Sequence, residues 1–313
     1  MVDIILPAGR AAIDLALFVL LPVMVVMLSL MRLLEAKGLL DGIVAWLTPT
    51  VRPFGLTGLS LFAALQINFV SFAAPIATLS MMEQRGASDR HLAATLAMVF
   101  AMAQANASLP LTALGLHLGP TLLFSTVGGL IAAAATYHGF GRHLSGEEHL
   151  TDDTLHHPTA EGAKGVLDVI NRAGAEAFKI TIGAIPLLVL ALVVVTALRH
   201  AGAVEGLTDL LTPFLGKLGI DPALILPTFI KYLAGGTAML GAVDDLLRQG
   251  QFTSTLLNQS AGFLIHPLDL PGVAILVSAG RRVASVWKMA ALGAGVGIVV
   301  RTLGHVLWMG AMT

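Results

Sequence analysis

The sequence predicts an all-α integral membrane protein made of two related halves. Three observations support this fold class: the composition, the length of the charge-free stretches, and a set of landmarks that recurs at a fixed spacing. Of the 313 residues, 56% are hydrophobic and only 12% are charged, and the mean hydropathy is +0.84. A soluble domain carries about 25% charged residues, so this chain has about half of the charged residues that a water-exposed surface usually needs.

Several of the charge-free stretches reach or approach the length of a membrane helix once their uncharged flanks are added. A helix needs roughly 20 mostly apolar residues to cross the hydrocarbon core. A soluble protein with this pattern would need several buried helices that have almost no polar face. The stretches are residues 54–82, 92–117, 180–198, 273–280 and 289–300.

Composition also excludes several classes of function. The net charge of −1 favours neither nucleic acid nor an anionic partner. The absence of cysteine removes disulfides, thiolate metal sites and thiol catalysis. No G-x-S-x-G, H-E-x-x-H or P-loop motif occurs. We therefore expect neither an enzyme nor a bound cofactor, and no structural metal.

The first half, residues 1–137, begins with a retained transmembrane helix over residues 13–33, since this apolar run is too long for a signal peptide. An amphipathic stretch over residues 39–47, closed by Thr48-Pro49, is predicted to lie along the membrane interface. The later elements are an apolar run over residues 56–82, a polar loop over 83–90, an apolar run from 91 that breaks at 106–110, and a last span over 118–137.

A polar linker is predicted at residues 138–164, because this segment holds seven acidic or basic side chains and five histidines. We expect its histidines to belong to a solvated tract rather than to a metal site. The second half, residues 165–313, opens with helical periodicity over residues 165–179 that leads into the span 180–198.

The two halves share landmarks at a constant offset of 164 residues, as in 202 − 38 = 164. Such a series without gaps indicates an internal duplication with about four to five membrane segments in each half. By analogy with transporters built from repeats, we expect the halves to be inverted. The landmark pairs are Pro22/Pro186, Gly38/Gly202, Pro49/Pro213, Gly55/Gly219 and Gly86/Gly250.

Polar residues interrupt the apolar runs in both halves, and these predict a site near the membrane midplane. Broken or re-entrant helices are tolerated at that depth only where they line a cavity or are buried in protein. Amides dominate in the first half and ionisable groups in the second, and an offset of 163 pairs Asn106 with Asp269. The candidate residues are Gln66, Asn68, Gln104, Asn106, Lys231, Thr237, Asp244, Asn258, His266 and Asp269.

Several of these residues allow a second interpretation. Lys231 is either a ligand or counter-ion in the cavity, or a side chain that snorkels to the interface. Asp244 and Asp245 are spaced to pair with Arg248 on one helix.

His266 and Asp269 either converge on one solute or proton, or Asp269 caps the following helix. Gln104 and Asn106 are ligands or bonds between packed helices. Gly128, Gly129, Gly293, Gly295 and Gly297 are expected to permit close helix packing.

The glycine–apolar–Thr-Pro stretch before a polar-interrupted segment resembles the nucleoside recognition, or Gate, domain. The second copy carries it best, in Ile182-Gly183 with Pro186, residues 211–214, Gly219 and residues 231–241. That domain occurs in concentrative nucleoside transporters, in the membrane part of bacterial ferrous iron transporters, and in spore maturation proteins A and B. The resemblance to the nucleoside transporters implies a pore-and-gate module with sodium or proton coupling. The iron transporters are associated with a pore cysteine, which this chain lacks.

Together these features predict a multi-pass transporter that moves a small polar solute, nucleoside-like first, with Na⁺ or H⁺ coupling. One alternative is a divalent-cation permease that uses Asp244, His266 and Asp269. The other is a non-transporting membrane scaffold of the spore-maturation type. The expected location is the inner (plasma) membrane of a bacterial cell, and the expected partners are the bilayer and the solute, with a homo-oligomer left open.

Overall fold

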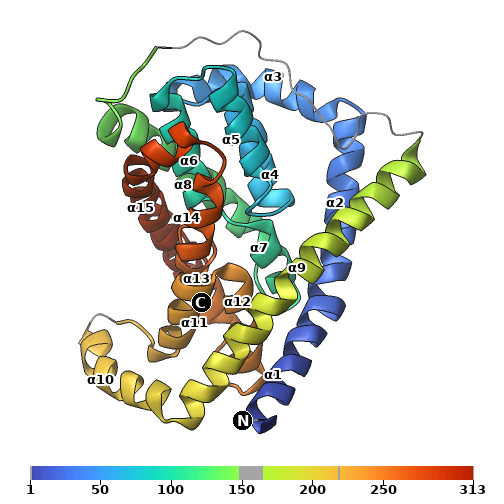
Figure 1. Cartoon of the computed structure of the whole chain (residues 1–313). Coiled ribbons are helices and arrows are strands. Elements are labelled where there is room, and N and C mark those ends of the chain that lie inside the picture. The colour runs from blue at the N-terminus through green and yellow to red at the C-terminus, as the bar shows by residue number, and fades with distance from the viewer. Residues whose placement is uncertain (1, 148–164, 218, 313) are drawn as a thin grey trace.

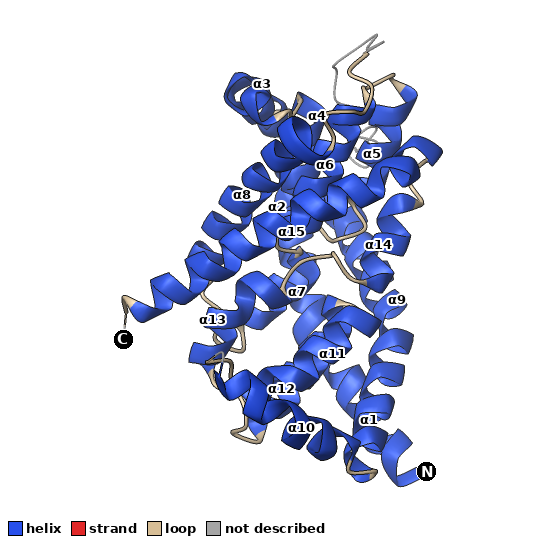
Figure 2. Ribbon diagram, turned by 90° about the vertical axis from the view of Figure 1, so that its left-hand side faces the viewer, coloured by secondary structure: helices blue, strands red, loops and turns tan. Residues whose placement is uncertain are grey.

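The computed structural model describes residues 2–147, 165–217 and 219–312, and these residues form helices and loops without any strand (Figures 1 and 2). The first half contains α1 (Val2–Asp14), η1 (Leu15–Leu20), α2 (Leu21–Ala36), α3 (Leu39–Val51), η2 (Arg52–Phe54), α4 (Gly58–Phe69), α5 (Pro75–Gln84), α6 (Asp89–Ala101), α7 (Ala105–Thr112), α8 (Leu118–Ala134) and η3 (Ala135–Phe140). The second contains α9 (Val166–His200), α10 (Ala203–Lys217), η4 (Pro222–Leu224), α11 (Ile225–Ala234), α12 (Gly236–Arg248), α13 (Ser254–Leu264), α14 (Leu270–Val277) and α15 (Arg281–Gly310).

Each half has the same order of elements, which confirms the predicted repeat. A long first helix is followed by a short helix, a hairpin of two short helices, a broken helix and a long last helix. We call α4–α5 the first hairpin and α11–α12 the second hairpin. The first broken helix is α6–α7, and the second is α13–α14.

The glycine landmarks mark matching ends of helices. Gly38 and Gly202 have φ of 67° and 68°, Gly55 and Gly219 have 75° and 67°, and Gly86 and Gly250 have 78° and 69°. A Cβ disfavours this left-handed conformation, so glycine is the residue that lets a chain leave a helix there. The constant offset of 164 therefore arises because the chain turns at matching glycines in both halves.

The halves run in opposite directions. In Figure 1 the helices α1 and α2 rise from the N-terminus, whereas α9 descends, and α3 and α10 lie at opposite ends of the molecule. Figure 2 places α3 and α10 at the same opposite ends. The repeat is therefore inverted, as the analogy predicted.

Five helices in the described part of the chain are long and apolar enough to cross a membrane: Ile4–Ala36, Asp89–Thr112, Leu118–Phe140, Val166–Leu198 and Arg281–Gly310. The apolar helices Gly58–Phe69 and Pro222–Ala234 are shorter and belong to the two hairpins. An 18-residue stretch of the span Asp89–Thr112 is wholly buried inside the protein, so the first broken helix runs through its interior.

The first span is longer than the predicted 13–33, because the helix continues through the π-helical turn η1. Pro22 is the second residue of α2, just after this turn. Proline removes one backbone donor and crowds the preceding turn, and a π-helical turn absorbs that disruption without ending the helix. The linker predicted at residues 138–164 lies outside the described residues from 148 onward, and η3 carries the last helix of the first half to Phe140. The boundaries 1–137 and 165–313 stay predictions.

Four of the five glycines expected at helix contacts do permit close packing. A Cβ on Gly128 would lie 2.2 Å from Cγ of Arg301, and one on Gly297 would lie 2.3 Å from the carbonyl oxygen of Gly128. Added Cβ atoms on Gly129 and Gly293 would also meet side chains of neighbouring helices. Gly295 faces open space, so its prediction was wrong.

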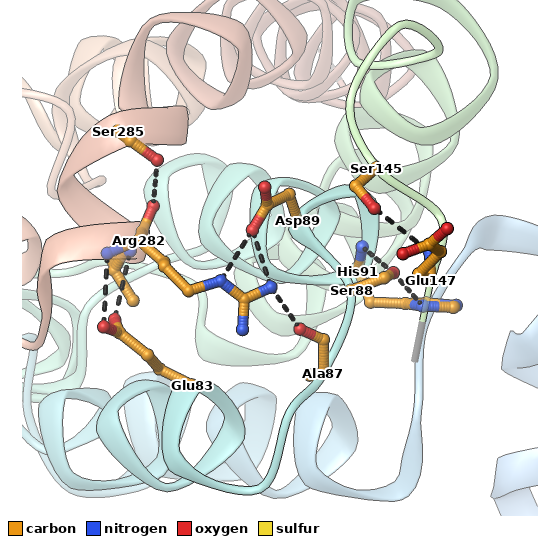
Figure 3. Close-up of polar contacts among 10 residues, drawn as sticks. Glu83, Ala87, Ser88, Asp89, His91, Ser145, Glu147, Arg282 and Ser285 are labelled. Atoms are coloured by element: carbon orange, nitrogen blue, oxygen red, sulfur yellow. Dashed lines mark hydrogen bonds and ion pairs between the residues drawn. The ribbon is translucent and has the colours of Figure 1, made fainter. Parts of the chain in front are cut away.

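A polar clasp joins the first half to the start of α15 (Figure 3). Glu83 accepts hydrogen bonds at 3.2 Å from the backbone N–H groups of Arg282 and Val283. The guanidinium of Arg282 binds Asp89 at 2.6 Å and the carbonyl oxygen of Ala87 at 2.7 Å. The carboxylate of Glu83 thus satisfies donors that helix N-termini leave unpaired.

Glu83→Gln should lower the free energy of unfolding by about 1 kcal/mol, because the amide keeps the shape but loses the charge that favours a helix N-terminus. Thermal unfolding in detergent measures this loss. The same change at the exposed Glu147 is the matched control and should have no effect. Equal stability of both variants would contradict the role of the clasp.

Candidate functional site

A cavity of about 530 Å³ lies where the two hairpins and the two broken helices meet. We call it the central cavity. Its volume falls in the range of about 300–1,000 Å³ that is typical of pockets for small organic ligands. The lining comprises residues 71–74 of the first hairpin, Gln104 and Asn106 of the first broken helix, residues 234–237 of the second hairpin, Asp269, Pro271 and Ile275 of the second broken helix, and Leu20, Glu176, Lys179, Ile180 and Gly183 of the long first helices.

Asn106 connects the tips of both hairpins. Its side-chain oxygen accepts from the backbone N–H of Phe72 at 3.2 Å, and its Nδ2 donates to Oγ1 of Thr237 at 2.7 Å. Phe72 belongs to the first hairpin and Thr237 to the second. One amide on the first broken helix therefore makes a hydrogen bond to each of the two hairpins.

Lys231 and Asp269 form a buried ion pair between Nζ and Oδ2. The other oxygen of Asp269 accepts from the backbone N–H of Gly272 at 2.7 Å and so caps α14. Lys231 is 0% exposed and lies behind the lining, which excludes the snorkelling interpretation. The cavity is therefore lined by the carboxylate of Asp269, and the buried ammonium of Lys231 outside the lining neutralises its charge.

Gln104 stands at the N-terminal end of α7, and its side chain is 2% exposed. Its Nε2 has no hydrogen-bond partner among the described residues. A Cβ on Gly236 would lie 1.7 Å from this nitrogen, so the amide rests directly against the first residue of α12. Glycine at position 236 is what makes room for it.

The helix ends also correct the predicted alignment of the halves. Ser88 and Thr253 precede α6 and α13, Gln104 and Asp269 precede α7 and α14, and both pairs differ by 165 residues. Asp269 therefore corresponds to Gln104, not to Asn106 as an offset of 163 implied. The same position carries a neutral amide in one half and a carboxylate in the other.

Gln66 and Asn68 support the cavity from outside its lining. Gln66 accepts from Oγ1 of Thr78 at 2.7 Å, within the first hairpin. Asn68 accepts from Oγ of Ser125 at 2.8 Å, and that oxygen accepts from the backbone N–H of Ala103 at 2.7 Å. This series of hydrogen bonds satisfies the backbone N–H of Ala103, which the break in the first broken helix leaves free.

Three further candidates lie away from the lining. Asp244 pairs with Arg248 at 3.0 Å and stands eight residues into α12, about 12 Å along the helix from its start. Asn258 accepts from the backbone N–H of His117 at 2.7 Å and so joins α13 to the start of α8. His266 is buried, and its Nδ1 accepts from the backbone N–H of Leu268 at 3.1 Å.

Sequence reasoning missed Arg301, which is 0% exposed inside α15. Its guanidinium donates to the carbonyl oxygen of Ala101 and, at 3.0 Å, to that of Ile265. These carbonyls end α6 and α13, so one arginine binds the C-terminal ends of the first segments of both broken helices. A lone arginine directly after the charge-free residues 289–300 was the available signal. Glu176 and Lys179 were also missed, since α9 read as a plain amphipathic entry to a span.

No family model matches this chain. Spore maturation protein B of Bacillus subtilis (strain 168) is 39% identical over 74 residues, which is 24% of this chain. The match spans only 41% of that protein's length.

Among solved structures, the chain is similar to CNTnw, a concentrative nucleoside transporter. An intermediate state gives a TM-score of 0.69 at 19% identity, covering 93% of this chain and 76% of that chain. An inward-facing substrate-bound state gives 0.66 at 18% identity, with 93% and 74% covered. An outward-facing state gives 0.66 at 17% identity, with 94% and 76% covered. At these identities the likeness establishes the fold, and it confirms the fold that the Gate-domain resemblance implied.

Proposed function

We propose that this protein is a membrane transporter that carries a small polar solute through the central cavity. The observation that carries the proposal is the cavity itself, which is lined by all four interruptions of an inverted repeat. Transporters with such repeats bind their solutes where discontinuous helices meet near the midplane. The likeness to a nucleoside transporter supports a nucleoside-like solute as the first candidate. Na⁺ or H⁺ coupling is what the Gate-domain resemblance implies.

The geometry supports an organic solute over a bare metal ion. The cavity has room for a ligand of drug-like size, and its lining offers Gln104, Thr237 and Asp269 as polar contacts. The described residues contain no group of three His, Cys, Asp or Glu side chains placed to hold a metal. The predicted cation site required Asp244, which pairs with Arg248 outside the lining.

A membrane scaffold is the second candidate, and the partial sequence match to spore maturation protein B favours it. A scaffold needs no open interior. The unpartnered donor of Gln104 and the volume of the cavity favour transport instead.

The test is uptake by proteoliposomes that contain the purified full chain. A panel of labelled nucleosides, sugars, amino acids and divalent metals is offered with and without a Na⁺ or H⁺ gradient. Transport predicts saturable uptake of at least one organic solute that one gradient stimulates. Absence of uptake across the whole panel, by protein that shows a cooperative unfolding transition, would leave the scaffold as the better account.

Asp244→Asn should leave uptake within about twofold of the wild type, since it breaks only an exposed i,i+4 pair that contributes about 0.3–0.5 kcal/mol. Asp269→Asn is the matched variant in the lining and should lower uptake. Loss of uptake in Asp244→Asn would show that the solute path includes the far end of α12.

A further inference from the structure

Four helices begin at the central cavity and run away from it. Ala74, Gln104, Gly235 and Asp269 line the cavity, and they directly precede α5, α7, α12 and α14. The N-terminus of a helix carries unpaired N–H donors and the positive end of the helix dipole. Such ends are favourable places for an anion.

Three of these N-termini carry no side-chain cap. Asp269 caps α14 with its carboxylate, whereas no side chain accepts a hydrogen bond at the starts of α5, α7 and α12. Proline begins α5, so that end lacks one donor. The starts of α7 and α12 therefore leave donors for an occupant of the cavity.

Gln104 supplies a second, independent observation. Its buried Nε2 is a donor without an acceptor, and it lies against Gly236 at the start of α12. A buried polar group without a partner is costly, so native structures rarely keep one unless a ligand or water completes it. The occupant that fits here is a hydrogen-bond acceptor placed between the starts of α7 and α12.

One cationic side chain of the cavity lining, Lys179, is left without an ion pair among the described residues. Lys231 pairs with Asp269. Arg32 is shared between Glu176, which it binds at 2.8 and 3.1 Å, and Glu35, which it binds at 2.6 Å. Lys179 is exposed at the lining and forms no ion pair with any described residue. Both carboxylates of the lining, Glu176 and Asp269, therefore have a cationic partner, whereas the ammonium of Lys179 has no partner in the described part of the chain.

We propose that the transported solute carries an anionic oxygen group, a phosphate or a carboxylate. This inference rests on the proposed transport function. The anionic group accepts from Gln104 Nε2 and from the backbone donors at the starts of α7 and α12. Lys179 attracts it at the mouth, and the rest of the cavity holds the uncharged part of the solute.

Matched pairs of solutes that differ in one anionic group test this inference in proteoliposomes. The pairs are uridine with uridine 5′-monophosphate, and glucose with glucuronate, so the arms separate phosphate from carboxylate. We expect the anion of at least one pair to be taken up about tenfold faster than its neutral partner. Lys179→Gln should raise the KM for that anion about 10- to 100-fold, as for the loss of a charge-assisted contact. Lys179→Glu should raise it further.

The control variant is Lys217→Gln, because Lys217 is exposed on α10 and lies outside the lining. It should leave the KM unchanged. Faster uptake of the neutral partner in both pairs, or an unchanged KM in Lys179→Glu, would overturn the anion while transport stands. If neither pair is taken up but another solute of the wider panel is, the anionic solute is overturned as well. If no solute of the whole panel is taken up, the proposed transport function itself fails.

Discussion

Replacing Lys231 by methionine should lower the free energy of unfolding by about 3–5 kcal/mol. The ammonium is fully buried and bound to Asp269, so its removal leaves a carboxylate without a countercharge inside the protein. Methionine matches the length of the side chain, so the change removes charge with little loss of volume. Chemical or thermal unfolding in detergent micelles measures the effect.

The double variant Lys231→Met with Asp269→Asn separates charge from packing. Asparagine keeps an oxygen that can accept from Gly272, and no charge remains buried. We expect the pair of changes to recover at least half of the lost stability. Lys217→Met, on the exposed end of α10, is the control and should be neutral. A single variant as stable as the wild type, or a double variant no more stable than the single, would show that the ion pair does not stabilise the second broken helix against α11.

The second large effect is expected at Gly262. A Cβ there would lie 2.5 Å from the backbone carbon of Arg301 and 2.5 Å from the backbone nitrogen of Thr302. Backbone cannot swing aside, so Gly262→Ala must push α13 away from α15. We expect a loss of about 1–3 kcal/mol in the free energy of unfolding. The shift would also move the guanidinium of Arg301 from the carbonyl oxygen of Ile265.

Gly295→Ala is the matched control, since Gly295 lies in α15 and an added Cβ there meets nothing within 4 Å. Alanine is the better helix former by about 1 kcal/mol, so this variant should be neutral or more stable. Unfolding of both variants under the same conditions gives the comparison. Equal effects would mean that the contact between α13 and α15 is not tight.

Much of the fold was predictable because its turns need glycine. The left-handed positions after matching helices admit glycine far more readily than other residues, so Gly38, Gly55 and Gly86 recur in the second half at an unchanged spacing. Charge-free length gave the spans. The direction of the second half came only from analogy, since sequence periodicity does not record which way a helix crosses the bilayer.

The candidate site was predictable in part, for a physical reason. A polar side chain in an apolar run has one of two roles. It faces a cavity, or it makes a hydrogen bond to a backbone group that a break in the helix leaves unpaired. Gln104, Asn106, Thr237 and Asp269 line the central cavity. Asn68, by contrast, binds Ser125 and through it the break itself. Spacing along one helix cannot separate the two roles, because the choice depends on which hairpin packs against it.

The residues that were missed show the complementary limit. Arg301 serves carbonyl oxygens of two other helices, 200 and 36 residues away in the chain. Glu176 belongs to an apolar-faced helix and finds its partner, Arg32, 144 residues earlier. Such roles come from tertiary contacts between helices that are distant in the sequence, so no local sequence pattern predicts them.

The central claim is that solute occupies the cavity at the four interruptions, and one cysteine can test it. The chain contains no cysteine, so Ala73→Cys places a single thiol in the lining and Ala201→Cys places one on the exposed turn after α9. The rate of maleimide labelling is measured with and without a transported solute. We expect solute to slow labelling of Ala73→Cys and to leave Ala201→Cys unaffected. Equal labelling of Ala73→Cys in both conditions, by protein that still transports, would place the solute path elsewhere.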